Sequence, residues 1–272
     1  MGGSLGLALK QRAICSRVIG LVRRTEAIEQ AIRAGLVDDA TTQPEAALEN
    51  ADIIFFATPV RTMLNQLTTF IPFYKPGAII TDMGSTKQTI VDVMDTLPAT
   101  LQPVGSHPMC GKEQSGMDVA EAELFEHAPW IITPLARTSP ETTQTIHTLA
   151  EAIGSHVYTI PADRHDRLVA TISHLPYSLA STLVNTARQV AEDDDSVWDV
   201  AATGFKDTSR VAAGSVEMWL DILLTNQTAV THILDIARQQ IDQLADAVAQ
   251  GDEAALRALL ESAAEQRRKM YK

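Results

Sequence analysis

The sequence has little cysteine and no long hydrophobic run. Cys15 and Cys110 are the only cysteines among its 272 residues. Two are too few for a disulfide framework or a cysteine-rich metal cluster, so we expect reduced thiols and no bound metal. No apolar stretch is long enough to span a bilayer, and no basic region followed by an apolar segment marks a secretory signal. The sequence therefore predicts a cytoplasmic protein with no membrane partner.

Positive charge is also scarce. The chain has 22 lysine and arginine residues against 34 aspartate and glutamate residues, which gives a formal net charge of −12. Because nucleic acids and anionic membranes attract basic surfaces, this balance argues against either as the main partner. It still permits a local basic pocket for an anionic small molecule. The 45% of hydrophobic residues can form a large core, and the length allows two domains.

Hydrophobic strand patterns alternate with helical patterns as far as residue 161. The predicted strands cover residues 17–24, 51–59, 78–82, 102–105, 130–134 and 156–161, and the predicted helices between them cover 25–34, 60–70 and 138–153. This alternation indicates βαβ units and a parallel sheet. Residues 1–9 read as the start of a helix with no strand before it.

The hydrophobic pattern of the sequence changes after residue 161. No strand pattern follows, and helix-forming residues with an apolar period of 3.6 dominate the rest of the chain. We therefore expect an α/β domain over residues 1–161 and an all-helical domain over residues 162–272.

Two predicted strands end in turns that carry a reactive group. Ser85 follows the strand at 78–82, and His107 follows the strand at 102–105. Ligands of open α/β sheets bind outside the carboxyl ends of the strands, so these groups predict one active site. Ser85 also begins a Ser-Thr-Lys-Gln capping box, so it either caps a helix or holds a polar ligand there. His107 can act as a general base near neutral pH.

The helical half contains two further candidate segments. Pro176 predicts a kink, which either points His174 and Tyr177 into a site or is only a packed bend. Asp207 and Arg210 lie three residues apart on a predicted helix. They form either a surface ion pair or a site at which the arginine binds a carboxylate in two-point geometry.

Short motifs along the whole chain occur in a specific order and spacing. They are Gly2-Gly3-Ser4-Leu5-Gly6, Ala57-Thr58-Pro59, Asp82-Met83-Gly84-Ser85-Thr86-Lys87, Ser106-His107-Pro108-Met109-Cys110-Gly111, Ser115-Gly116, Leu124-Phe125, Ile172-Ser173-His174-Leu175-Pro176, Gly204-Phe205-Lys206-Asp207-Thr208-Ser209-Arg210-Val211-Ala212 and Met218-Trp219. This ordered set resembles the prephenate/arogenate dehydrogenase family of tyrosine biosynthesis.

The resemblance implies a Rossmann-type dinucleotide-binding domain followed by an all-α dimerisation domain that forms a homodimer. It implies oxidative decarboxylation of prephenate or arogenate with hydride transfer to NAD or NADP. By position, His107 would accept the ring hydroxyl proton, and Ser85 would orient His107 and the nicotinamide. The substrate-binding residues would be Arg210, Lys112, Glu113, His174, Tyr177 and Asp207, and the cofactor-binding residues Gly2, Gly3, Arg23, Arg24, Thr58, Pro59 and Ser85.

The predicted strand at residues 17–24 corresponds to the second strand of the family, and the residues at its end influence the choice between NAD and NADP. An acid at this place binds the adenosine ribose hydroxyls and favours NAD. Here Arg23 and Arg24 follow the strand, and the first acid is Glu26. Because an arginine fork can bind an additional phosphate, the sequence favours NADP over NAD.

The chain departs from the family pattern in two places. The family opens with a strand and a Gly-x-Gly-x-x-Gly turn, whereas Met1 falls just before the last of those glycines. We therefore expect the sheet to lack a central strand and the pyrophosphate cradle to be incomplete. Tyr177 stands where some prephenate-specific relatives have histidine, which leaves prephenate and arogenate both open as substrates.

Two other functions are compatible with the sequence. One is another two-domain reductase, of the pyrroline-carboxylate reductase or β-hydroxyacid dehydrogenase type, against which Ser106-His107-Pro108 speaks. The other is an inactive homologue that dimerises without binding a dinucleotide. The retention of Ser85, His107 and Arg210 argues against it.

Overall fold

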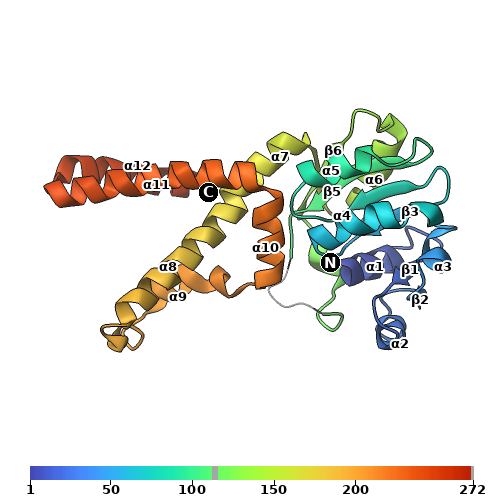
Figure 1. Ribbon diagram of the computed structural model, residues 1–272, viewed down its shortest axis with the longest axis horizontal. Helices are drawn as coiled ribbons and strands as arrows, with labels where there is room; N and C mark the ends of the chain where they lie inside the picture. Colours follow the sequence, from blue (N-terminus) through green and yellow to red (C-terminus); the bar gives the residue numbers. More distant parts are fainter. Residues whose placement is uncertain (112–115, 271–272) are drawn as a thin grey trace. The chain divides into compact units, whose positions relative to one another are not determined.

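The computed structural model describes residues 1–111 and 116–270, and it divides into two compact units (Figure 1). The first unit is Met1–Asn226, and the second is Gln227–Lys272. All strands found in the described residues belong to the first unit. The sequence-predicted residues Lys112 and Glu113 lie outside the described residues.

The strands of the first unit form two sheets. In the smaller sheet, β1 (Ile19–Leu21) pairs in parallel with β2 (Asp39–Thr41). The larger sheet has the order β3-β4-β5-β6-β7. Its strands are β3 (Ile53–Phe56), β4 (Ile79–Asp82), β5 (Gln102–Pro108), β6 (Pro129–Pro134) and β7 (His156–Thr159). Within the described parts of the chain, no ladder joins β1 to β3.

The direction of β6 corrects the expectation of a fully parallel sheet. β6 runs antiparallel to β5, whereas β3, β4 and β5 are mutually parallel and β7 is parallel to β6. A parallel return needs a crossover connection, usually a helix. In the described residues between β5 and β6, the regular element is only the short 3₁₀ helix η2 (Ala122–Phe125). The antiparallel ladder also lengthens β5, so that His107 pairs with Ile131 inside the strand rather than following it.

Helices cover both faces of the larger sheet through two separate cores. One core packs Met63 and Leu67 of α4 and Met94 of α5 against β3 and β4. The other packs Leu5 of α1 and Ile146 of α6 against β5 and β6. The helices of this α/β part are α1 (Gly2–Gln11), α2 (Glu26–Arg33), α3 (Pro44–Leu48), α4 (Val60–Thr69), η1 (Ile71–Phe73), α5 (Gln88–Asp95) and α6 (Pro140–Ala152). Two-sided coverage of this kind is the Rossmann-type arrangement.

The change to all-helical structure occurs after β7, as the sequence predicts. The elements that follow within Met1–Asn226 are α7 (Ala162–Val169), η3 (Ala170–His174), α8 (Leu175–Ala191), η4 (Asp195–Val197), α9 (Thr203–Ser209), η5 (Arg210–Ala213) and α10 (Val216–Thr225). The helical pattern is interrupted next to Pro176, because η3 is a single π-helical turn directly before α8, in which Pro176 is the second residue. Proline cannot donate a backbone hydrogen bond, and a wider turn accommodates its ring.

The second unit is a helical hairpin. It consists of α11 (Gln227–Gln250) and α12 (Glu253–Met270), which contact each other (Figure 1). Gly251 adopts φ +64° at the turn, a conformation that glycine adopts without steric cost. Among the described helices, none is long and apolar enough to cross a bilayer.

Candidate active site

The carboxylate of Asp82 connects the ends of β4 and β5. Asp82 is completely buried, and its Oδ1 accepts a hydrogen bond from the backbone N–H of Ser106 at 2.9 Å. Its Oδ2 accepts the N–H of Gly84 at 2.7 Å and forms an ion pair with the equally buried ammonium of Lys87. These contacts hold the Gly84-Ser85 turn beside the residue that precedes His107. The two strand-end groups predicted from the sequence therefore belong to one hydrogen-bonded framework.

Ser85 does not cap α5, so the capping-box interpretation is wrong. The helix begins at Gln88 with Lys87 as its N-cap residue and has no side-chain cap of its own. Instead, the side chain of Asp166 accepts the N–H of Lys87 at 2.7 Å and the N–H of Gln88 at 2.9 Å. A carboxylate from α7 thus satisfies the first N–H groups of the helix. This leaves the half-buried Ser85 on the turn before the helix.

His107 is hydrogen-bonded to a second histidine. Its Nδ1 lies 2.8 Å from Nε2 of His165, and Nδ1 of His165 lies 2.8 Å from Oδ1 of Asp166. His107 is half-buried, whereas His165 and Asp166 are buried. The sequence analysis missed both partners. The available signal was the position of His165 one helical turn before the buried Val169, which places it on the inward face of α7.

Burial keeps two histidines of this site, His107 and His174, in their neutral form. It lowers the pKa of His107 well below its ordinary value, and the neighbouring His165, Lys87 and His174 act in the same direction. Burial also lowers the pKa of His174 to about 4, with the charge of Asp166 opposing the shift. A neutral imidazole has a lone pair, so His107 can accept a proton at neutral pH.

His174 and Tyr177 gather around one tryptophan. Tyr177 stacks on Trp219 with ring centroids 3.7 Å apart and planes at 10°, and His174 meets the same ring edge-on at 6.2 Å. Asn226 lies 3.3 Å from Nδ1 of His174 and also donates to the backbone carbonyl of Asp166 at 2.8 Å. The structure therefore connects His174 to the His107 group.

Asp207 and Arg210 lie on a different segment. Asp207 is in α9 and Arg210 begins η5, and both side chains are exposed. Both segments pack on α8.

The first turn of α1 lies against the end of β3. A Cβ at Gly2 would approach the Cβ of Ala57 to 3.1 Å, and a Cβ at Gly6 would lie 2.0 Å from the carbonyl oxygen of Leu36. Glycine is therefore required for α1 to pack this closely. The helix also begins without a side-chain cap, and uncapped N–H groups at a helix start can bind a phosphate. Gly2 is exposed and Gly3 half-buried at this end.

A cleft of about 660 Å³ lies near this edge. It is lined by Arg23, Pro59, Arg61, Thr62, Asn65, Glu217 and Asp221. The structure therefore brings the sequence-predicted Arg23 and Pro59 to one cleft. Both Arg23 and Arg24 are exposed, and Arg24 is not among the lining residues. Thr58 donates its hydroxyl to Gln66 at 2.8 Å, which gives this side chain a local structural partner.

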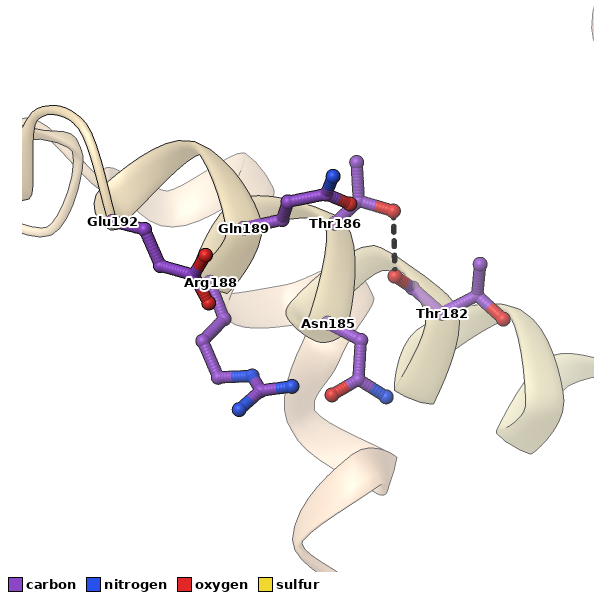
Figure 2. Close-up of a pocket in the computed structure, with 6 residues that line it drawn as sticks. All are labelled: Thr182, Asn185, Thr186, Arg188, Gln189 and Glu192. Carbon is purple, nitrogen blue, oxygen red and sulfur yellow. Dashed lines mark hydrogen bonds between the residues drawn. The ribbon is translucent and has the colours of Figure 1, made fainter.

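A second hollow, of about 420 Å³, contains none of the predicted site residues (Figure 2). Its lining comes from α8 and the residue that follows the helix: Thr182, Asn185, Thr186, Arg188, Gln189 and Glu192. The hydroxyl of Thr186 donates to the backbone carbonyl of Thr182 at 2.9 Å, as in an ordinary helix (Figure 2). A single helix cannot enclose a small ligand, so this hollow is not a candidate active site.

Two family models match consecutive parts of the chain. The description "Prephenate dehydrogenase, nucleotide-binding domain" matches residues 5–159, and "Prephenate dehydrogenase, dimerization domain" matches residues 161–262. The chain belongs to the prephenate dehydrogenase family. It is therefore an NAD(P)-dependent dehydrogenase, with a Rossmann-type nucleotide-binding part and a helical part of the dimerisation type.

Individual relatives agree with this family. The chain is 34% identical over 254 residues to a prephenate dehydrogenase of Bacillus subtilis strain 168, covering 93% of this chain and 68% of that protein. It is 32% identical over 256 residues to the cyclohexadienyl dehydrogenase of Zymomonas mobilis, covering 93% of this chain and 86% of that protein. The family's reaction is the oxidative decarboxylation of prephenate or arogenate in tyrosine biosynthesis.

Solved structures show the same architecture. The arogenate dehydrogenase of Synechocystis superimposes with a TM-score of 0.85 at 33% identity, covering 99% of this chain and 96% of that one. The Aquifex aeolicus prephenate dehydrogenase, solved with hydroxyphenyl propionate and NAD+, superimposes with a TM-score of 0.93 at 26% identity, covering 99% and 94%. A 3-hydroxyisobutyrate dehydrogenase of Salmonella typhimurium shares only the fold, with a TM-score of 0.58 at 13% identity. The alternative of a β-hydroxyacid dehydrogenase type is thereby set aside.

Proposed function

We propose that His107 is the base in the oxidation of a cyclohexadienyl substrate. The carrying observation is a neutral, half-buried imidazole held beside the Ser85 turn by Asp82. His107 accepts the proton of the ring C4 hydroxyl while hydride leaves C4, and the bound nicotinamide supplies the hydride acceptor. The ring carboxylate departs as carbon dioxide, its bonding electrons enter the ring, and the phenolic oxygen regains the proton. Ser85 orients His107 and the nicotinamide.

We propose that Arg210 binds a substrate carboxylate. The guanidinium is exposed and is a planar fork suited to two-point binding of a carboxylate. His174, Tyr177 and Asp207 line the same substrate site in this proposal, as do Lys112 and Glu113 outside the described residues. The stacked Tyr177 and Trp219 rings offer a flat surface for a six-membered ring.

We propose that the chain binds its dinucleotide at the α1 end and prefers NADP to NAD. Gly2 and Gly3 at the uncapped start of α1, with Thr58 and Pro59 after β3, would hold the phosphates. Arg23, in the 660 Å³ cleft, and the exposed Arg24 would bind the additional phosphate. The Aquifex aeolicus relative was solved with NAD+, so both cofactors belong in the test.

We also propose that the protein is a cytoplasmic homodimer and that residues 1–161 and 162–272 are its two functional domains. Support for dimerisation comes from the family description of residues 161–262 and from exposed apolar side chains on α11, including Ile241, Leu244 and Val248. Such side chains are typical of a buried interface between protomers.

The deciding experiment is an assay of the purified protein with prephenate and arogenate, each with NAD+ and NADP+. Formation of the reduced nicotinamide is followed by absorbance, and the aromatic product is identified by mass spectrometry. Wild-type turnover with at least one substrate, lost in His107→Asn, is the expected result. Absence of reduced cofactor in all four combinations would overturn the proposal. Sedimentation equilibrium tests the dimer, and a monomer at micromolar concentration would contradict it.

A further inference from the structure

A buried pair of residues stands behind His107. His165 has no exposed surface and Asp166 is 4% exposed, so neither residue can touch the substrate directly. They nevertheless form a continuous chain of hydrogen bonds to His107, with 2.8 Å between the two imidazoles and 2.8 Å between His165 and Asp166. The wild-type sequence therefore buries an ionisable carboxylate and a second histidine next to the base.

The direction of every hydrogen bond in this chain can be worked out from Asp166. Its Oδ1 receives the backbone N–H of Lys87 and its Oδ2 receives that of Gln88. Backbone N–H groups only donate, so both carboxylate oxygens are acceptors. Nδ1 of His165 must then carry a hydrogen and donate it to Oδ1.

The hydrogen bond from His165 also determines the tautomer of His107. A neutral imidazole has one donor nitrogen and one acceptor nitrogen, and a donating Nδ1 makes Nε2 of His165 the acceptor. Nδ1 of His107, which lies opposite that acceptor, is therefore the donor. The lone pair of His107 is left on Nε2, where it can accept a proton.

We propose that His165 and Asp166 are positioning residues that hold His107 as the Nδ1–H tautomer, with Nε2 as its basic nitrogen. The inference rests on the proposed role of His107 as the base. When Nε2 takes a proton, the positive ring is already hydrogen-bonded to His165, whose far nitrogen bonds a carboxylate. Partners of this type orient a reactive histidine and select its tautomer.

Asp166 has a second task that makes the arrangement rigid. The carboxylate that accepts the His165 hydrogen bond at Oδ1 also caps α5 through both of its oxygens, directly after the turn that carries Ser85. Asn226 additionally donates to the Asp166 carbonyl at 2.8 Å. A shift of α7 would therefore disturb His107 and the Ser85 turn together, so one residue couples the two strand-end groups.

Nitrogen-15 NMR of the histidine rings tests the tautomer without any turnover. The His107 signals are assigned by their absence in His107→Asn. The wild type should show a protonated Nδ1 and an unprotonated Nε2 at pH 7.5, and His165→Leu should show a mixture of tautomers. An unprotonated Nδ1 of His107 in the wild type would overturn the inference. This measurement remains valid even if the substrate assay fails, which separates the two proposals.

Kinetics of three matched variants test the function of the pair. His165→Leu removes the acceptor, and kcat should fall about 10–100-fold, the usual effect of losing a partner that orients a histidine. His165→Gln keeps an amide oxygen near the Nε2 position and should recover most of that loss. KM and cofactor affinity should stay within about twofold in both, because neither residue contacts the ligands. His156→Leu, on the exposed end of β7, is the control and should behave as wild type.

Thermal unfolding and circular dichroism of each variant separate misfolding from a loss of positioning. A folded His165→Leu with wild-type kcat would refute the inference, as would folded Leu and Gln variants that are equally slow. If the Leu variant does not fold, the Gln variant and the wild-type NMR spectrum still decide the question. Asp166→Asn should also lower kcat, whereas Asp163→Asn on the exposed side of α7 should not.

Discussion

Lys87 and Asp82 form an ion pair in which both side chains are completely buried. Burial lowers the pKa of Lys87, and the negative charges of Asp82 and Asp166 oppose that shift. Asp82 also accepts the N–H groups of Gly84 and Ser106. The pair therefore connects the ends of β4 and β5, and it holds the Ser85 turn at a fixed distance from His107.

Removing one partner of this pair should be strongly destabilising. Lys87→Met leaves the Asp82 carboxylate buried without its cation, so the free energy of unfolding should fall by about 3–5 kcal/mol. The double variant Asp82→Asn with Lys87→Met should lose less, because no unpaired charge remains. Urea unfolding measures both. Lys75→Met, which breaks the exposed pair with Asp52, is the control at about 0–1 kcal/mol. A Lys87→Met protein as stable as this control would contradict the prediction.

His107→Asn should abolish most turnover while the protein still binds its cofactor. Loss of a general base lowers kcat by about 10²–10⁴-fold. Steady-state kinetics give kcat, and fluorescence titration gives the Kd of the reduced cofactor, which should change little. His156→Asn, an exposed histidine of β7, serves as the matched control. If turnover by His107→Asn stayed near the wild-type value, another group would have to be the base.

Arg210→Ala should weaken substrate binding and leave cofactor binding alone. A charge-assisted hydrogen bond contributes about 1.5–3 kcal/mol, so KM should rise roughly tenfold or more. Arg257→Ala on α12 removes an exposed arginine that pairs with Glu253 four residues earlier, and its KM should not change. An unchanged KM in Arg210→Ala would make this arginine structural.

Arg23→Ala and Arg24→Ala should each reduce kcat/KM with NADP and spare kcat/KM with NAD. The reason is that only NADP carries the phosphate that these guanidinium groups are proposed to bind. The informative quantity is the ratio of the two kcat/KM values in the wild type and each variant, with Arg257→Ala again as control. A wild type that prefers NAD, or variants with an unchanged ratio, would show that the arginines are indifferent to the cofactor.

The stability of the fold should fall as the pH is lowered from 6.5 towards 4. Burial lowers the pKa of His174 from 6.5 to about 4. In that interval the unfolded chain binds a proton that the folded chain does not, so protonation favours unfolding. The loss amounts to at most about 3 kcal/mol for this residue, and the lowered pKa of His107 acts in the same sense.

Urea unfolding at pH 7.5, 6.0 and 5.0 measures this dependence. His174→Gln should lose less free energy of unfolding between pH 7.5 and 5.0 than the wild type, because the titrating ring is gone. His156→Gln, an exposed histidine, should keep the wild-type dependence. If the free energy of unfolding changed equally with pH in His174→Gln and in the wild type, His174 would not be the cause of the pH dependence.

Local signals in the sequence were sufficient for most of the elements. Apolar runs predicted β3, β4 and β7, and helical periodicity predicted α4 and α6. Gly35, which adopts φ +70°, ended α2 where a glycine stop was expected. The three-residue β2 and the five-residue α3 were missed because elements this short carry too few residues for a period to show. The correctly predicted elements depend on residues within a few positions of one another along the chain.

The sequence by itself determined the α/β-to-helical order, the interruption of the helical pattern next to Pro176 and the family to which the chain belongs. Only the tertiary structure decided the antiparallel course of β6, the capping of α5 by Asp166 and the contact of His165 with His107. The physical reason is distance along the chain, since His165 lies 58 residues after His107. A capping box at Ser85 is a preference of the local sequence. In the folded protein, the Asp166 carboxylate on α7 accepts the first N–H groups of α5 instead.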